Sequence, residues 1–297
     1  MTEVSLHNPP PFLLEAVTYI ESELSACIED LQLPQNLADA TTYAVMNGGK
    51  RVRPALTLLC SQAVGGTKES ALPAAIAVEF IHCFSLVHDD LPSIDDDDLR
   101  RGKPTLHIHA GEAMALLAGD ILLPLAFLQL TSPTLSPTQQ AALSGELADA
   151  TKKMVVGQVY DTLGGLPSDL NPKEAIETIH QNKTGALIQC ACKLGAICGN
   201  ASKDQLQAMS EYGNAIGLMF QIVDDLIDLH GIEEHVGKAT RKDVEAGKKT
   251  YPSLLGIEAS KTAILDLKSK AQTAIGSLSQ NGETLRSFNL WLAQRTR

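Results

Sequence analysis

Apolar residues recur every three or four positions along most of the chain, which is the spacing of an amphipathic helix. Two such runs are Leu13, Val17, Ile20, Leu24, Ile28 and Leu31, and Met209, Tyr212, Ile216, Met219, Val223 and Leu226. No segment shows the sustained alternation of apolar and polar residues that is typical of a half-buried strand. The pattern therefore predicts an all-α protein.

Glycine and proline separate these helical runs. The separating stretches are Gly48-Gly49, Gly65-Gly66, Ser132 to Pro137, Gly164 to Pro172 and Gly199-Asn200. Their spacing predicts helices of roughly 15–25 residues joined by short loops. Because none of these stretches is long enough to be a flexible linker, residues 1–297 are predicted to form a single domain.

Composition excludes some classes of protein. The 297 residues are 44% hydrophobic and 20% charged, as in an ordinary soluble globular protein. The net charge of −11 argues against a nucleic-acid-binding surface, which would be basic. The N-terminus lacks the pattern of a signal peptide, and the most apolar run, Ala113 to Leu130, contains Asp120 and Pro124. We therefore expect no membrane insertion.

The cysteines lie in apolar stretches and form no pair of C-x-x-C motifs. They are Cys27, Cys60, Cys83, Cys190, Cys192 and Cys198. Free cysteine behaves as a small hydrophobic residue, so these positions are expected in the core. The sequence therefore predicts a reducing, cytoplasmic location without a disulfide framework.

Two acidic clusters, each following an apolar helical run, are the strongest chemical signal. They are Asp89-Asp90-Leu91-Pro92-Ser93-Ile94-Asp95 and Asp224-Asp225-Leu226-Ile227-Asp228. Neighbouring carboxylates repel one another and are costly to desolvate unless a cation compensates them. Mg²⁺ prefers carboxylate oxygens and commonly bridges them to a substrate phosphate. One acidic run is usually a solvated helix end, whereas two of matching form predict a clamp for a metal-bound diphosphate.

The spacing within each cluster indicates which side chains lie together. The second cluster places Gln221, Asp224, Asp225 and Asp228 on one stripe of a helix that is otherwise apolar. In the first cluster, Pro92 makes continuation of the helix past Asp90 or Leu91 unfavourable. Asp89 at the helix end and Asp95 in the following loop are then able to meet around a cation. Asp96, Asp97 and Asp98 are interpreted as solvated or supporting charges.

Basic residues accompany both clusters. The stretch Gly48 to Pro54 combines a glycine turn, three cations and a proline suited to the first position of a helix. Its backbone N–H groups, with Lys50 and Arg53, predict an anion site. Further candidates are Arg100, Arg101 and Lys103 after the first cluster, Lys183-Thr184 at an expected helix start, and Lys238 after the second cluster. Any one lysine taken alone is more often a solvated charge.

From end to end, these motifs resemble the trans-isoprenyl diphosphate synthases, in particular the bacterial farnesyl diphosphate synthases. The resemblance is carried by G-G-K-R-V-R-P (48–54), H-D-D-L-P-S-I-D-D-D-D-L-R-R-G-K-P-T (88–105), G-D-I-L-L-P-L-A-F (119–127), G-Q-V-Y-D (157–161), K-T-G-A-L-I (183–188), F-Q-I-V-D-D-L-I-D (220–228) and T-Y-P-S-L-L-G (250–256). It implies the isoprenoid synthase fold, a bundle of long antiparallel helices around a central cavity, and a homodimer.

The resemblance also implies roles for individual residues. Asp89, Asp90 and Asp95, with Asp224 opposite, match residues that hold three Mg²⁺ ions, for which Mn²⁺ is a possible substitute, and Asp225 and Asp228 complete the second metal motif. Arg100, Lys183 and Lys238 match residues that bind the allylic substrate, dimethylallyl or geranyl diphosphate. Lys50, Arg53, His82 and Arg101 match residues that bind isopentenyl diphosphate. Catalytic roles fall to Lys183, Thr184, Gln221 and Lys238.

The expected reaction is a head-to-tail (1'-4) condensation. Loss of pyrophosphate leaves an allylic cation, and the double bond of isopentenyl diphosphate attacks that cation. Phe84 lies about 7 Å along the helix from Asp89, at a rise of about 1.5 Å per residue. A bulky ring at this position resembles the pattern of farnesyl-producing family members, in which it would block further elongation and stop the product at (2E,6E)-farnesyl diphosphate. An ordinary core aromatic is the alternative reading of Phe84, and the small Ser85 does not block the chain by itself.

Other readings stay open. The same chemistry with geranyl or geranylgeranyl diphosphate as product is the nearest alternative. A class I terpene cyclase would not need the second anion site, and a non-catalytic partner subunit of a synthase would be expected to lose motif carboxylates. Arg241, in the loop Lys238 to Asp243, stands where many relatives have glycine, and its role is open.

Overall fold

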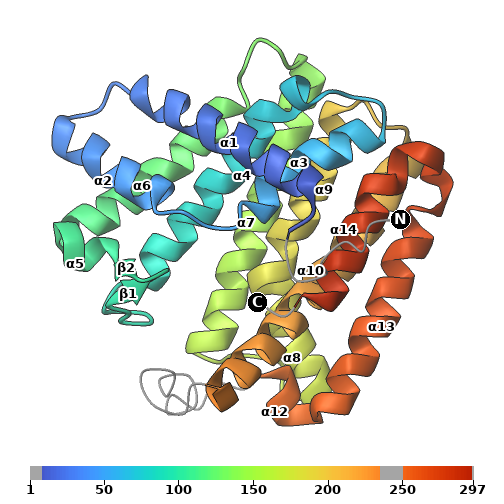
Figure 1. Ribbon diagram of the computed structural model, residues 1–297. Coiled ribbons are helices and arrows are strands. Elements are labelled where there is room, and N and C mark those ends of the chain that lie inside the picture. Colours follow the sequence, from blue (N-terminus) through green and yellow to red (C-terminus); the bar gives the residue numbers. More distant parts are fainter. Residues whose placement is uncertain (1–8, 235–249, 296–297) are drawn as a thin grey trace. The chain divides into compact units, whose positions relative to one another are not determined.

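The structure, a computed structural model, describes residues 9–234 and 250–295 (Figure 1). This part of the chain is almost entirely helical and forms two compact units. Unit 1 consists of Asp149–Cys192 and Ser202–Arg297 with the residues up to Pro11, and unit 2 consists of Phe12–Ala148 and Lys193–Ala201. The all-α prediction is confirmed.

Unit 2 is built mainly from the helices of the first half of the chain. Its elements are α1 (Pro11–Glu29), α2 (Gln35–Met46), α3 (Val52–Ala63), α4 (Lys68–Asp89), β1 (Leu99–Arg100), β2 (Lys103–Pro104), α5 (Leu106–Ala110), α6 (Glu112–Gln129) and the first part of α7 (Pro137–Thr162). The two short strands pair antiparallel. They were not predicted, because two residues are too few to show an alternating pattern.

Helix α4 is the central helix of unit 2 and packs against α3 and α6. It begins at a capping box, in which Thr67 and Ser70 accept hydrogen bonds from each other's backbone. Small buried residues such as Ala74 and Ala77 allow its neighbours to approach closely. As predicted from Pro92, the helix ends at Asp89, so the first acidic cluster lies at its C-terminal end.

Unit 1 contains the last part of α7 and the helices of the second half of the chain. These are α8 (Pro172–His180), the π-helix η1 (Gln181–Gly185), α9 (Ala186–Cys198, whose last residues belong to unit 2), α10 (Lys203–Glu234), α12 (Tyr251–Leu255), α13 (Ile257–Ala274), the 3₁₀-helix η2 (Gly276–Gly282) and α14 (Glu283–Gln294). Helix α10 packs against η1, α13 and α14. Its predicted apolar run is buried except for the half-buried Leu226, and Tyr212 donates a hydrogen bond to the carbonyl of Leu285 at 2.9 Å.

Two predicted helix starts were wrong. Helix α3 begins at Val52, so Pro54 is its third residue, which is still within the first turn where no intrahelical N–H bond is lost. Lys183 and Thr184 lie inside η1, within a run of helix that is continuous from α8 to α9. That run begins at Asn171, whose side chain accepts from two backbone N–H groups, and polar residues at 181–184 do not interrupt it.

Helices α4 and α6 are both long and apolar enough to cross a membrane by length and composition alone. The apolar stretch of α4 is 67% buried within the protein, whereas that of α6 is 33% buried. Contrary to expectation, Asp120 and Pro124 do not interrupt α6. Leu116, Leu117 and Leu128 of this helix are exposed. The apolar composition of α4 is explained by its burial in the core of unit 2, whereas α6 exposes part of its apolar surface.

The cysteines are free, as predicted. Five of them are buried and Cys27 is half-buried. Burial raises the pKa of the Cys83 and Cys198 thiols to about 12, so neither is a ready nucleophile. This agrees with their interpretation as core residues.

Candidate active site

The glycine turn before α3, in unit 2, binds the guanidinium of Arg101 through its backbone. Gly48 and Gly49 have φ angles of 83° and 130°, which favour glycine. The Arg101 guanidinium donates to the carbonyl of Gly48. It also lies against Gly49, where an added Cβ would be 2.6 Å from Nη1. A side chain at position 49 would therefore displace the Arg101 guanidinium from this position.

Arg53 and His82 form the second part of this cation site. Arg53 Nη1 lies 3.2 Å from His82 Nε2. Burial and the nearby Arg53 and Arg101 charges hold the pKa of His82 well below its ordinary 6.5, so the neutral ring accepts the hydrogen bond. Burial also lowers the pKa of Arg53 to about 10, and its Nε is buried without a partner among the described residues. An oxygen anion would satisfy this donor and offset the desolvation of the guanidinium.

Arg51, the third cation of the same motif, points into unit 2. Its φ of 45° is left-handed, and its side chain is buried. It donates to Glu21 Oε1, Glu79 Oε1 and the carbonyl of Val45, each at 2.6 Å. Arg51 therefore anchors the loop internally, which leaves anion binding to its neighbours.

The first acidic cluster divides into a paired carboxylate and two half-buried ones. Asp90 is buried, and Arg100 Nε lies 2.7 and 2.8 Å from its two oxygens. Burial raises the pKa of Asp90, and the Arg100 guanidinium opposes that rise. Asp95 donates its backbone N–H to the carbonyl of Asp89 at 2.9 Å, so these two residues meet across one turn. The backbones of Asp89 and Asp95 are thus brought together, while the carboxylate of Asp90 is held by Arg100; that Asp89 and Asp95 meet around a cation stays a prediction.

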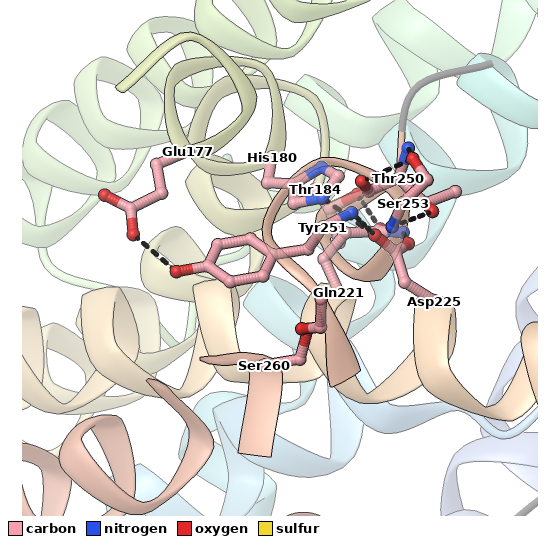
Figure 2. Close-up of polar contacts among 10 residues, drawn as sticks. Glu177, His180, Thr184, Gln221, Asp225, Thr250, Tyr251, Ser253 and Ser260 are labelled. Carbon is pink, nitrogen blue, oxygen red and sulfur yellow. Dashed lines mark hydrogen bonds and ion pairs between the residues drawn. The ribbon is translucent and has the colours of Figure 1, made fainter. Parts of the chain in front are cut away.

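The second acidic cluster, in unit 1, combines one buried carboxylate with two that are more exposed. Asp225 is buried and accepts hydrogen bonds from Gln221 and His180 and from the backbone of Tyr251 (Figure 2). Asp224 is half-buried and forms an ion pair with Arg295. The Arg295 guanidinium also lies over the ring of Phe220, 4.6 Å from its centroid, and burial lowers its pKa to about 10. Asp228, one turn further along α10, is exposed.

Lys183 and Thr184 are presented by the π-helix η1, a local irregularity that often occurs at functional sites. Lys183 Nζ lies 2.5 Å from Asp161 Oδ2. The backbone of Lys183 passes so close to Gly157 that an added Cβ there would be 2.2 Å from its nitrogen. Thr184 donates its hydroxyl to Gln221 Oε1 at 2.8 Å. Asp161 therefore positions the Lys183 side chain, Gly157 allows the backbone of Lys183 to approach closely, and Gln221 holds Thr184.

Several residues of the site were not singled out from the sequence. Asp161 and Tyr251 lie in two of the seven motifs that carry the family resemblance, and their place in those motifs is the sequence signal that could have identified them. His180 and Arg295 carry no local signal, because their partners are distant in the chain. Lys238 and Arg241 lie outside the described residues, so their predicted roles stay predictions.

Comparison with known proteins decides the family. Residues 34–283 match the family described as polyprenyl synthetase. The chain belongs to this polyprenyl synthetase family. It is an all-α prenyltransferase that makes a prenyl diphosphate, with the isoprenoid synthase fold.

Individual members of the family are similar over most of the chain. "Geranylgeranyl pyrophosphate synthase 11, chloroplastic" of Arabidopsis thaliana is 45% identical over 247 residues, which are 81% of this chain and 69% of that protein. The FPP/GFPP synthase structure from Zymomonas mobilis has a TM-score of 0.82 and 33% identity, covering 95% and 97% of the two chains. A geranylgeranyl pyrophosphate synthetase structure from Pyrococcus horikoshii has a TM-score of 0.83 and 30% identity, covering 95% and 97%.

Each unit of this polyprenyl synthetase carries carboxylates of the kind that bind Mg²⁺. Among the described residues, no three His, Cys, Asp or Glu side chains are grouped so that they could hold an ion. The candidate donors are instead few and distributed: Asp89 and Asp95 at the end of α4, and Asp224 and Asp228 on α10. A donor set of carboxylates alone fits Mg²⁺, which keeps several waters and needs only one or two protein carboxylates when a diphosphate supplies the other oxygens. The residues therefore fit the predicted metal.

Proposed function

We propose that this protein catalyses the Mg²⁺-dependent head-to-tail condensation of isopentenyl diphosphate with allylic diphosphates, ending at geranylgeranyl diphosphate. The observation that carries the proposal is the presence of two kinds of anion site. The carboxylates of the two acidic clusters suit a diphosphate that is bound through metal ions. A separate group of side chains, Arg53, His82 and Arg101, suits a diphosphate that is bound directly by cations. Two diphosphate substrates need two such sites.

The protein's own groups act in a defined order in this proposal. Arg53 and Arg101 bind the diphosphate of isopentenyl diphosphate, and neutral His82 leaves the full positive charge of that site to its neighbours. Lys183 moves from Asp161 to the allylic diphosphate, for which its ammonium is one of the donors. Thr184 and Gln221 present oxygen dipoles to the allylic cation. When bound, Mg²⁺ supplies positive charge that stabilises the departing pyrophosphate.

Product analysis tests the reaction itself. We expect the protein, incubated with Mg²⁺, isopentenyl diphosphate and dimethylallyl diphosphate, to release pyrophosphate and form longer prenyl diphosphates. EDTA is expected to stop the reaction. A folded protein that forms no longer product under these conditions would contradict the proposal and favour a cyclase or a non-catalytic partner subunit.

The length of the product has a second candidate. The names of the curated relatives favour the twenty-carbon geranylgeranyl diphosphate. Phe84 favours the fifteen-carbon farnesyl diphosphate, because its ring is 9% exposed and packs edge-to-face on His88 at 4.8 Å in unit 2. His88 is in turn 3.2 Å from the carbonyl of Leu116 on α6. A ring supported in this way is a stiff obstacle beside α4.

If Phe84 limits the product to fifteen carbons, Phe84→Ala is expected to lengthen it by at least one five-carbon unit, because the substitution removes the ring and leaves space next to α4. Chromatography of the dephosphorylated products measures the chain length. Ser85→Ala is the matched control on the same helix, since it removes only a hydroxyl that donates to the carbonyl of His82. A twenty-carbon product from both the natural protein and Phe84→Ala would show that Phe84 is an ordinary core residue.

We also propose that two copies associate through α6. This helix is strongly apolar, and Leu116, Leu117 and Leu128 are 46%, 54% and 60% exposed. An exposed apolar face of this kind marks an interaction site in a soluble protein. Leu117→Glu is expected to convert a dimer to a monomer in sedimentation velocity, because it places a charge in the interface. Leu265→Glu, at a position on α13 that is 63% exposed, is the control and should leave the mass unchanged. A monomeric natural protein would contradict this assignment.

A further inference from the structure

The carboxylate of Asp225 accepts hydrogen bonds from three different segments of unit 1 (Figure 2). Gln221 Nε2 lies 2.9 Å from Oδ1, and His180 Nε2 and the backbone nitrogen of Tyr251 lie 3.0 and 2.8 Å from Oδ2. Because an ionised carboxylate is only an acceptor, His180 donates through Nε2. Asp225 is 6% exposed. With both oxygens engaged inside the protein, it is poorly placed to hold a metal ion as well.

The same hydrogen bonds determine how Gln221 is oriented. Since Asp225 Oδ1 only accepts, the amide nitrogen of Gln221 must face it, and the amide oxygen of Gln221 faces Thr184. That oxygen also only accepts, so the Thr184 hydroxyl donates to it. The hydroxyl proton of Thr184 therefore points toward Gln221, and the lone pairs of its oxygen point away from Gln221. The buried charge of Asp225 thus sets the direction of a relay of two successive hydrogen bonds, from Gln221 to Asp225 and from Thr184 to Gln221, and so orients the hydroxyl of the catalytic candidate Thr184.

We propose that Asp225 is a positioning residue and not a metal ligand: through Gln221 it makes Thr184 present its oxygen lone pairs to the developing allylic cation. The inference rests on the proposed function. It assigns different tasks to the two adjacent carboxylates of the motif: Asp225 has both oxygens hydrogen-bonded inside the protein, whereas metal binding is left to Asp224, which is half-buried and ion-paired with Arg295 through one oxygen. It also accounts for the burial of His180 and Tyr251, which occupy the other carboxylate oxygen and so leave Oδ1 to Gln221.

Asp225→Asn separates this role from metal binding and from packing. His180 and Tyr251 both donate to the position of Oδ2, so the oxygen of the introduced amide must occupy that position and its nitrogen must face Gln221. Gln221 then turns over, its nitrogen faces Thr184, and the Thr184 hydroxyl proton points outward. All of the hydrogen bonds are kept while the dipole is reversed. The expected result is a kcat lowered by about 10- to 100-fold.

Binding of Mn²⁺ in the presence of inorganic pyrophosphate, followed by electron paramagnetic resonance, is the second readout. Asp225→Asn is expected to leave the Mn²⁺ dissociation constant unchanged, whereas Asp224→Asn is expected to raise it by about 10-fold or more, as loss of a ligand does. A rise for Asp225→Asn that equals the rise for Asp224→Asn would overturn the proposal. This arm does not require turnover, so it decides the metal assignment even if the natural protein forms no product and the proposed function fails.

A double variant distinguishes the relay from a general structural role. Thr184→Val removes the hydroxyl dipole, so adding it to Asp225→Asn is expected to raise kcat back to that of Thr184→Val alone. Additive losses would overturn the relay. Thr178→Val, which removes an exposed hydroxyl from α8, is the control and should retain full activity. If Asp225→Asn does not fold, Gln221→Met carries the test: it should match Thr184→Val in kcat, and full activity would contradict the proposal.

Discussion

Asp89→Asn is expected to lower kcat for condensation by about 10²–10³-fold, or about 3–4 kcal/mol of transition-state stabilisation, while the protein stays folded. The substitution keeps the shape of the side chain and removes one negative charge from the end of α4. Asp90 cannot replace it, because Asp90 is buried against Arg100. The metal that Asp89 is proposed to hold would then be bound weakly at the point where pyrophosphate departs.

Steady-state rates over a range of Mg²⁺ concentrations measure this effect. The Mg²⁺ concentration for half-maximal rate is expected to rise together with the loss in kcat. Asp98→Asn is the control, since Asp98 is exposed in the following loop and is interpreted as a solvated or supporting charge. A natural Mg²⁺ requirement and rate in Asp89→Asn would contradict the metal assignment of the first cluster.

Arg51→Met is expected to destabilise the protein by about 3–5 kcal/mol, because it leaves the buried carboxylate of Glu79 without its counter-charge. The guanidinium contributes three hydrogen bonds at 2.6 Å, and the side chain of Glu79 is only 2% exposed. Equilibrium unfolding in urea, followed by circular dichroism, measures the loss. The loop that carries Lys50 and leads into the first turn of α3, where Arg53 lies, should loosen at the same time, with weaker binding of isopentenyl diphosphate.

Two variants test the cause of that loss. Glu21→Gln is expected to cost less than about 1 kcal/mol, because the Glu21 side chain is 37% exposed and its ion pair is screened by water. Arg51→Met combined with Glu79→Leu is expected to recover most of the stability, since apolar replacement of a whole buried pair is often neutral. If the double variant is as unstable as Arg51→Met, the loss comes from the loop conformation and not from the unpaired charge.

Most of the secondary structure was predictable because each helix has a local signal. The apolar stripe of α1 and the breaker at Gly199-Asn200 were sufficient to predict helices there, and Pro92 was sufficient to end α4. The errors occurred where local preference was weak. The polar stretch before Lys183-Thr184 indicated a helix start there, but these residues lie inside a π-helix that packs against α10 and in which Lys183 contacts Asp161. Pro124 is exposed but stays inside α6, a helix that packs against α4, α2 and α5.

The sequence by itself determined the all-α class, the helical stripes and the residues that carry the chemistry, because these depend on side chains close together in the chain. Only the tertiary structure decided how those residues are used. Asp89 and Asp90 were given the same metal-binding role from the sequence, and Asp224 and Asp225 were assigned to one metal motif; Lys50 and Arg53 were chosen for the anion site, with no role predicted for Arg51. Burial, and partners such as Glu79, Arg100 and His180 brought from distant segments, make some of these charges internal anchors. The cost of desolvating a charge depends on its surroundings in the folded protein, which no local pattern records.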